Sequence, residues 1–197
     1  MAHRLDAVLA TIDDANRADP NLVEDRPRAL LEGQRATEWV AQLRPDAPES
    51  VLVAARAHHL TRWMVPRSSY PEGRAGYLRW RRDQKQRHAD DMSAILSTHR
   101  FDPGFIERVQ SLLLRTDLGT DPDAQLVEDA ACLVFLETRF DDIVVRLDHD
   151  QLIGVVAKTL AKMSPAAIAA TSAINLSEAG RTALAEAASR AEDRSGL

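Results

Sequence analysis

The stretch LVEDAACLVFLETRF, residues 126–140, shows the pattern that decides the fold class. Its large apolar side chains recur at intervals that place them on one side of an α-helix, and they are Leu126, Leu133, Leu136 and Phe140. Asp129 falls on the same side, because it follows Leu126 by three residues and precedes Leu133 by four. The stretch therefore predicts a helix whose apolar face includes one acidic residue.

The same helical periodicity continues through most of the chain, and no run of alternating polarity indicates a sheet. Earlier helices are expected near residues 5–12, 30–43, 51–59, 77–95 and 105–113. Helix N-termini are expected after Asp46, Asp102, Asp148, Ser164 and Ser177. The sequence thus predicts an all-α, single-domain helical bundle over residues 1–197, with its core at about 26–163 and the helices of 165–192 as an appendage.

The composition is typical of a globular protein, with 45% hydrophobic and 28% charged residues among 197. The single cysteine, Cys132, lies in the apolar run AACLVFL, which indicates a buried thiol in a reducing compartment. The N-terminal residues lack the apolar core of a signal peptide, and no apolar run approaches the length of a membrane span. We therefore expect a cytoplasmic protein that does not enter a membrane.

Positive charge is concentrated in one segment of an acidic chain. The net charge is −5, but residues 56–87 hold nine basic and two acidic residues, or +7, which leaves −12 for the remainder. A local basic segment indicates a small anionic ligand and speaks against extended nucleic acid as the partner. The alternative is a solvated helix face whose charges pair with one another.

Ionisable residues interrupt the apolar faces of three expected helices. Burial of such groups is costly unless they are paired, hydrogen-bonded or bound to a metal. Imidazole nitrogen and carboxylate oxygen are ligands of zinc, manganese and iron. The candidate ligands of such a divalent ion are His58, His59, His88 and Asp129. The alternative is a set of core residues that each form separate hydrogen bonds.

The segment PRSSYPEGRAGYLRWR, residues 66–81, contains two prolines and two glycines that break the helical pattern, which predicts a functional loop over 65–77. Arginine suits phosphate or carboxylate, and an aromatic ring suits stacking on a base or sugar. The residues of this region that we expect to bind substrate are Arg62, Arg67, Tyr70, Arg74, Tyr77 and Arg79. The alternative is an ordered loop packed by its own aromatic residues.

The segment ARAHHL, residues 55–60, resembles the motif helix of HD-domain phosphohydrolases. The resemblance implies a helical bundle with a divalent metal, in which His58 matches the motif histidine, His88 lies on a following helix and Asp129 matches the last aspartate. Two positions depart from the pattern. His59 stands where the family has the motif aspartate, and the preceding helix has no histidine, so that Glu32, Gln34 or Glu38 would have to replace the first ligand.

A second resemblance covers most of the chain. The stretches AARAHHLTRW, PRSSYPEGRAGYLRWR and LVEDAACLVFLE are similar to those of an uncharacterised family, domain of unknown function 4202. This resemblance implies a family membership and brings no activity with it.

The combined features favour a divalent-metal-dependent hydrolase of a small phosphorylated, nucleotide-like substrate. In this hypothesis the metal activates water, and Asp91, Glu128 or His59 transfers protons. Two alternatives stay open: a non-catalytic helical module that binds an anion through residues 65–82, and an iron-dependent oxygenase of HD-like architecture. The sequence leaves the oligomeric state open, including a homo-oligomer.

Overall fold

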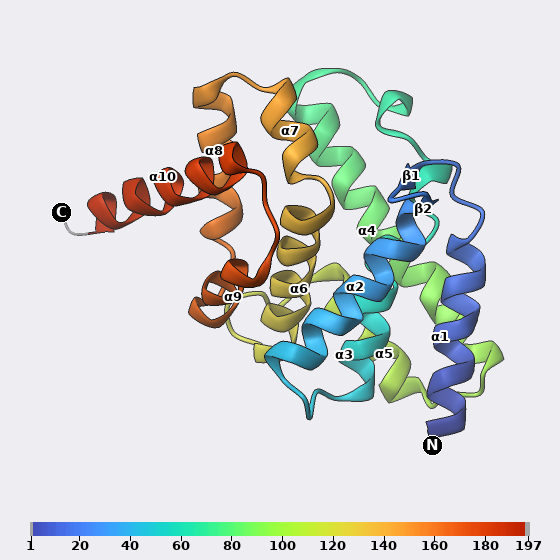
Figure 1. The fold of residues 1–197 in the computed structure, drawn as a ribbon. Coiled ribbons are helices and arrows are strands. Elements are labelled where there is room, and N and C mark those ends of the chain that lie inside the picture. The colour runs from blue at the N-terminus through green and yellow to red at the C-terminus, as the bar shows by residue number, and fades with distance from the viewer. Residues whose placement is uncertain (1, 196–197) are drawn as a thin grey trace. The chain divides into compact units, whose positions relative to one another are not determined.

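The computed structural model describes residues 2–195, with side chains from residue 3 to residue 190 (Figure 1). Helices dominate these residues, which confirms the predicted all-α class. Contacts gather the residues up to Val127 into one compact unit and those from Glu128 onward into a second, and we describe each by itself. The extent of a single core over residues 26–163 stays a prediction.

The first unit is built mainly from five helices within the described residues. They are α1 (Ala2–Asn16), α2 (Arg28–Leu43), α3 (Glu49–Arg56), α4 (Gly73–Thr98) and α5 (Pro103–Leu114). The long helix α4 packs along α5, while α3 packs against both α2 and α5. Two short 3₁₀ turns, η1 (Arg62–Met64) and η2 (Arg67–Ser69), connect α3 to α4. This connection carries five of the predicted site residues, which are His58, His59, Arg62, Arg67 and Tyr70.

The core of the first unit consists of apolar residues at the predicted helical spacing. Its fully buried members include Val8, Ile12, Leu31, Val40, Val51, Met92, Leu96 and Leu112. Burial of each such side chain contributes roughly 1.5–3 kcal/mol to folding. The helix α5 begins as predicted, because the Asp102 side chain accepts a hydrogen bond from the backbone amide of Phe105 at 3.0 Å.

A small hairpin between α1 and α2 was not predicted. Strands β1 (Leu22–Val23) and β2 (Arg26–Pro27) pair antiparallel, and the intervening Glu24 and Asp25 both have positive φ. Two residues are too few to show the polar–apolar alternation by which a strand is recognised. The buried Asp19 supports the hairpin by accepting bonds from the amides of Asn21 and Ala29, each at 2.9 Å.

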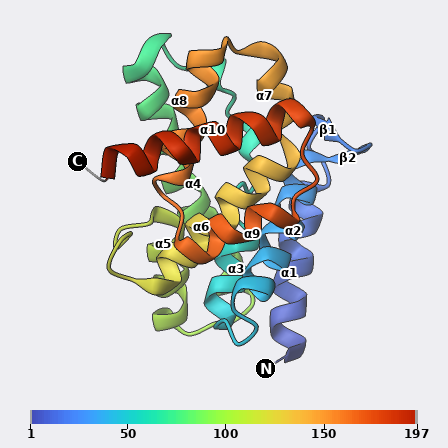
Figure 2. The same ribbon diagram turned by 60° about the vertical axis from the view of Figure 1, so that its left-hand side comes forward.

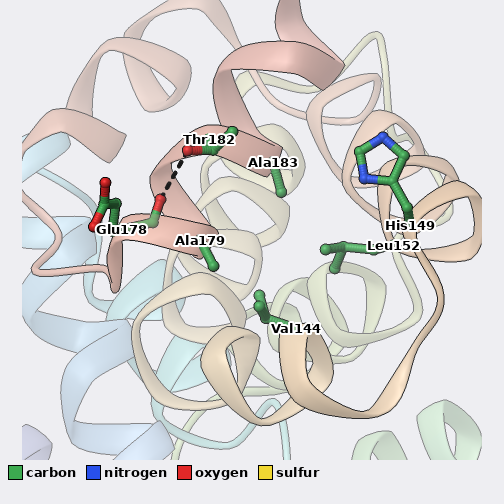
Figure 3. A pocket seen from close by; sticks show the side chains of 7 residues that line it. All are labelled: Val144, His149, Leu152, Glu178, Ala179, Thr182 and Ala183. Atoms are coloured by element: carbon green, nitrogen blue, oxygen red, sulfur yellow. Dashed lines mark hydrogen bonds between the residues drawn. The ribbon is translucent and has the colours of Figure 1, made fainter.

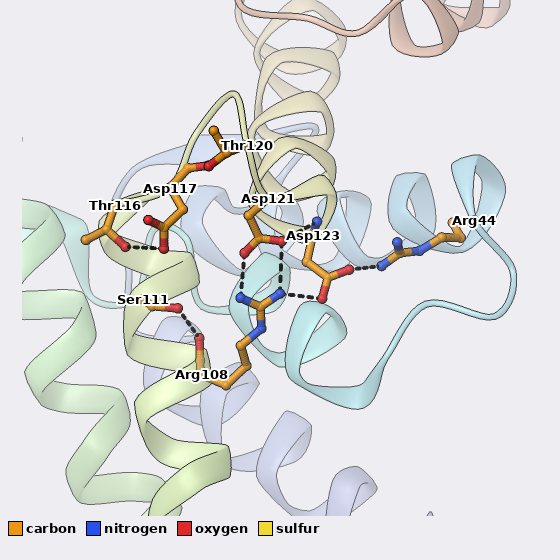
Figure 4. A network of polar contacts seen from close by, with 8 residues as sticks. All are labelled: Arg44, Arg108, Ser111, Thr116, Asp117, Thr120, Asp121 and Asp123. Carbon is orange, nitrogen blue, oxygen red and sulfur yellow. Dashed lines mark hydrogen bonds and ion pairs between the residues drawn. The ribbon is translucent and has the colours of Figure 1, made fainter.

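An ion network in the first unit joins the middle of α5 to the end of α2 and to the start of α6 (Pro122–Thr138) (Figure 4). Arg108 on α5 forms two bonds to the Asp121 carboxylate and one to Asp123, and Asp123 also contacts Arg44 after α2. The bonds from Arg108 hold the pKa of Asp121 below its ordinary value. Burial raises the pKa of Asp123, but the bonds from Arg44 and Arg108 outweigh it and lower that pKa. The network fixes the start of α6.

The second unit holds the later part of α6 and four further helices within the described residues (Figure 2). They are α7 (Phe140–Arg146), α8 (His149–Leu160), α9 (Pro165–Ala170) and α10 (Glu178–Ser195), with the turn η3 (Thr171–Ala173) after α9. Helix α10 packs against α7 and α8. Asp148 and Ser164 cap α8 and α9 as predicted, and the Ser177 hydroxyl accepts a bond from the Gly180 amide.

The predicted face of residues 126–140 is buried along its whole length, including Asp129 at 3% exposure. Cys132 is buried, as expected. Among the described residues, no helix has the length and apolar character needed to cross a membrane.

Three predicted boundaries were wrong. Helix α3 ends at Arg56, so that His58 and His59 lie beyond it in a turn. Helix α4 begins at Gly73, inside the expected loop 65–77. Pro48, and not Asp46, directly precedes α3, and no side chain caps this helix.

Candidate functional site

Three side chains of the first unit meet in a group that could hold a metal ion. Glu32, His58 and His59 each offer one ligand atom, and these atoms lie within 4.8 Å of one another. Glu32 and His58 are buried, whereas the His59 side chain is 23% exposed. Glu32 is one of the three residues that the sequence left open as a replacement for the absent histidine of α2.

The two histidines occupy a turn that we call the histidine turn, residues 57–61. After α3 the backbone tightens, since the His58 and Leu60 amides bond to carbonyls three residues earlier. The turn ends at Thr61, whose φ of 46° places it in the left-handed region. The backbone therefore departs from the helix, and the adjacent histidine rings approach each other, with centroids 4.1 Å apart.

Two polar side chains from other helices hold this turn. The buried Asn16 at the end of α1 accepts a bond from the Thr61 amide at 2.9 Å and donates to the Ala29 carbonyl at 3.3 Å. Arg87 on α4 donates to the Thr61 carbonyl at 2.6 Å. Because Thr61 is neither glycine nor asparagine, its left-handed conformation costs free energy that these contacts offset.

A glycine lets α2 approach the end of α3. A Cβ atom on Gly33 would lie 2.6 Å from the Arg56 carbonyl oxygen, far inside normal contact. Glu32 precedes this glycine and Arg56 precedes the histidine turn by one residue. The missing side chain at Gly33 is thus what allows the Glu32 carboxylate to reach His59 Nδ1, 2.5 Å from its Oε2.

The tautomer of His58 follows from its hydrogen bond. Its Nδ1 lies 2.8 Å from the Ala55 carbonyl oxygen, which can only accept, so Nδ1 carries the hydrogen. Burial, followed by the charge of His59, lowers the pKa of His58 well below its ordinary value, so the ring is neutral. Nε2 then bears a lone pair and has no hydrogen-bond partner among the described residues. A backbone carbonyl on Nδ1 with a bare Nε2 is typical of a metal-ligating histidine.

His88 faces the interior from α4, as predicted, but it is not part of the three-residue group. Burial lowers its pKa well below the ordinary value, and the charges of His59, Arg62, Arg87 and His58 act in the same direction. Neither ring nitrogen has a hydrogen-bond partner among the described residues. Asp91 lies one turn further along α4 and is half-buried.

The two acidic candidates of α6 belong to the second unit. Asp129 accepts a hydrogen bond from the Ser164 amide at 2.8 Å, and Glu128 lies 3.8 Å from the Lys162 ammonium. These contacts match the alternative in which the buried acid bonds to backbone. A metal shared by His58, His88 and Asp129, and the HD-like architecture with it, stay predictions.

Several residues expected to bind substrate instead organise their own segment. Arg67 donates to the carbonyls of Tyr70, Pro71 and Gly73, at 2.9, 2.8 and 3.1 Å. The Tyr70 hydroxyl donates to Asp83 at 3.1 Å. The Arg62 guanidinium lies 4.3 Å from the Trp80 ring centroid. The remaining three, Arg74, Tyr77 and Arg79, point to solvent from the first turns of α4.

A cavity of about 500 Å³ lies in the second unit (Figure 3). Its lining is Val144, His149, Leu152, Glu178, Ala179, Thr182 and Ala183. The Thr182 hydroxyl donates to the Glu178 carbonyl at 3.0 Å, and His149 lies 3.1 Å from the Glu186 carboxylate, outside the lining. The two ionisable residues of the lining, His149 and Glu178, lie on opposite sides in Figure 3, so the histidine turn is the better candidate.

The sequence interpretation missed Asn16, Gly33 and Arg87, the residues that support the histidine turn. Arg87 follows Gln84 by three residues in a helix that was predicted, so its place on the same face as Gln84 could have been inferred. Asn16 and Gly33 gave no comparable signal, because their roles depend on contacts with residues distant in sequence.

Comparison with known proteins gives one match. No curated protein and no solved structure matched the chain. The profile described as "Domain of unknown function (DUF4202)" matches residues 6–184. Because this match spans nearly the whole sequence, the chain belongs to the DUF4202 family.

Proposed function

We propose that the chain is a divalent-metal-dependent hydrolase of a small phosphorylated substrate, with its metal centre at Glu32, His58 and His59. The observation that carries the proposal is the convergence of three ligand atoms within 4.8 Å, in a group that includes a neutral, buried histidine whose Nε2 has no hydrogen-bond partner among the described residues. Two imidazoles and one carboxylate are a set found in catalytic zinc sites, which leave a coordination position open. A bound ion would supply Lewis acidity and a water of lowered pKa.

The chain's own residues would orient this centre. The Ala55 carbonyl holds the His58 ring through Nδ1, and Asn16 and Arg87 hold the turn that carries both histidines. The His59 Nδ1 and Glu32 Oε2 atoms lie at hydrogen-bonding distance, 2.5 Å apart, so one of the two groups carries a proton there. Ion binding by these two groups would require that proton to leave, so metal affinity should rise with pH.

The surrounding charge suits an anionic substrate. Arg62 follows the histidine turn directly and is close enough to His88 to lower its pKa. Arginine side chains in this place would neutralise phosphate oxygens. Asp91 is the candidate general base, because it belongs to the same unit and to the face of α4 that carries His88.

Metal analysis of protein purified without chelator or nickel column tests the centre. We expect about one ion per chain, and loss of the ion in Glu32→Gln and in His58→Ala. His149→Ala, which removes a largely exposed histidine of the second unit, is the matched control and should retain the metal. Asp129→Asn should also retain it, whereas loss in this variant alone would restore the predicted centre at His58, His88 and Asp129.

Hydrolase activity is tested by incubating the metal-loaded protein with a panel of nucleotides and sugar phosphates and measuring the phosphate released. Turnover that disappears in His58→Ala, with the folded state retained by circular dichroism, supports the hydrolase. A metal-loaded chain that binds these compounds and turns over none of them would favour the non-catalytic anion-binding module.

A second candidate has a specific observation in its favour. Two histidines and one carboxylate with open positions are also the ligand set of non-haem iron(II) oxygenases. Metal identity and oxygen uptake separate the two: tightly bound iron with substrate-dependent oxygen consumption would replace the hydrolase by an oxygenase. We place either activity in the cytoplasm, because the cysteine is buried and reduced thiols are typical there.

A further inference from the structure

Basic and aromatic residues form a stripe along α4. Its members follow one another at steps of three, four, four and three residues, and they are Arg74, Tyr77, Arg81, Lys85 and His88. Residues at these spacings share one face of a helix. The C-terminal end of the stripe belongs to the protein interior, since His88 is buried and Lys85 donates to the Leu114 carbonyl at 3.4 Å.

The N-terminal part of the stripe reaches solvent through the exposed Arg74 and Tyr77 and the half-buried Arg81, and we call these three residues the basic aromatic patch. The Tyr77 side chain is 43% exposed although it is a large ring, and Arg74 is also exposed. The Arg81 guanidinium lies 5.8 Å from the Tyr77 ring centroid. The patch therefore presents a flat ring with a cation beside it and a second cation one turn before.

We propose that the basic aromatic patch binds a short single-stranded nucleic acid. Tyr77 would stack on a base, while Arg74 and Arg81 would contact the phosphates on either side of it. Exposed rings flanked by arginines are the elements by which proteins bind single strands without reading sequence. The proposal is independent of the metal centre.

The charge distribution favours a short single strand over other anionic partners. A duplex needs a broad basic surface, whereas the residues outside 56–87 carry −12 against the +7 of this segment. A membrane surface needs a continuous apolar face, whereas the exposed large apolar residues of α4 are two neighbours, Tyr77 and Leu78, which Arg79 follows directly. An acidic peptide would pair with the arginines but would give the Tyr77 ring no role.

Fluorescence anisotropy of the full chain with a labelled oligouridylate of about 12 nucleotides tests the proposal. Tyr77→Ala should weaken binding by about fivefold or more, and Tyr77→Phe should restore it, because phenylalanine keeps the stacking surface. Arg74→Ala and Arg81→Ala should each lower the slope of log affinity against log salt by about 0.7, the value for one phosphate contact on a single strand.

The matched control is Arg79→Ala. Arg79 is an exposed arginine of the same helix, but it lies two residues after Tyr77 and thus on the opposite side. Affinity and salt slope should be unchanged in this variant. An equal loss in Arg79→Ala and Arg74→Ala, or an unchanged affinity in Tyr77→Ala, would overturn the proposal. So would tighter binding of polyglutamate or of anionic phospholipid vesicles than of the oligonucleotide, with the same dependence on Tyr77.

Discussion

The histidine turn and the basic aromatic patch lie in the same basic segment of the chain, yet their arginines have different roles. Those near the turn bond to other parts of the protein, and those of the patch reach solvent. At the turn, Arg87 donates to the Thr61 carbonyl and bonds the Gln84 side chain. At the patch, Arg74 extends into solvent from the start of the same helix. Basic residues that are alike in the sequence are therefore divided by the face of α4 on which they fall.

The difference shows how a positive segment can combine a structural and a binding role. Trp80, Gln84 and Arg87 recur at helical spacing on the inward face, and each bonds to the backbone of residues 61–65. These bonds fix the connection between α3 and α4, which is half-buried and has no regular partner for its carbonyls. Arg74 lies outside that face and is exposed, so it remains available to a ligand.

The largest effect that we predict comes from Gly33→Ala, which should disturb the histidine turn and leave the basic aromatic patch unchanged. The new Cβ would lie 2.6 Å from a backbone oxygen, so α2 and the end of α3 must separate. We expect the free energy of unfolding to fall by about 3 kcal/mol, with loss of the bound metal. Urea denaturation and metal analysis measure the two effects.

The control for this substitution is Gly154→Ala in α8. A Cβ there meets no atom within 4 Å, and alanine favours the helix by up to about 1 kcal/mol, so stability should rise slightly. If Gly33→Ala is as stable as the control and keeps its metal, then close approach of α2 does not position Glu32.

The next prediction compares two arginines of α4 directly. Arg87→Met should lower the free energy of unfolding by about 2 kcal/mol, because it removes charged donors from the Thr61 carbonyl and the Gln84 side chain. Arg79→Met should change it by less than about 0.5 kcal/mol, since Arg79 is exposed. Equal effects in urea denaturation would show that the two faces of α4 do not differ as we infer.

The contrast also explains which features the sequence could reveal. The buried face of residues 126–140 and the cap at Asp102 follow from local spacing and local hydrogen bonds, and both were predicted correctly. The end of α3 at Arg56 was not predictable in this way. No glycine or proline marks it, and the left-handed Thr61 depends on Asn16, which is 45 residues earlier.

The candidate site was predictable in part for the same reason. His58 and His88 were expected to be buried because they interrupt apolar spacing, and they are. Glu32 could only be named beside Gln34 and Glu38. The structure distinguishes the three candidates, because Glu32 joins the two histidines while Gln34 bonds to Asp13 and Glu38 to Arg35.

A third prediction concerns the pH dependence of stability in the presence of EDTA. Burial, with neighbouring positive charges, holds the pKa of His88 well below that of an unfolded chain. The unfolded state therefore binds the proton first as the pH falls. Stability is complete above pH of about 6.5 and declines below it, by up to about 1.4 kcal/mol per pH unit for this histidine.

His88→Leu should make that decline shallower in urea titrations between neutral and mildly acidic pH. His149→Leu, at a largely exposed position, should leave it unchanged. An equal slope in the wild type and in His88→Leu would mean that His88 does not titrate differently in the folded and unfolded chains.

The smallest effect that we predict is for Trp80→Phe, at the border between the turn and the patch. The indole donates to the Val65 carbonyl at 2.9 Å, but Gln84 donates to the same oxygen at 2.7 Å. Removal of the indole N–H leaves that oxygen satisfied, so the loss should be only about 0.5–1 kcal/mol. Gln84→Leu removes the hydrogen bonds that Gln84 donates to the Arg62 and Val65 carbonyls, so it should lower the free energy of unfolding by more than Trp80→Phe does. If Trp80→Phe is instead the costlier change in urea denaturation, the Arg62–Trp80 contact, and not the carbonyl bonds, holds this connection in place.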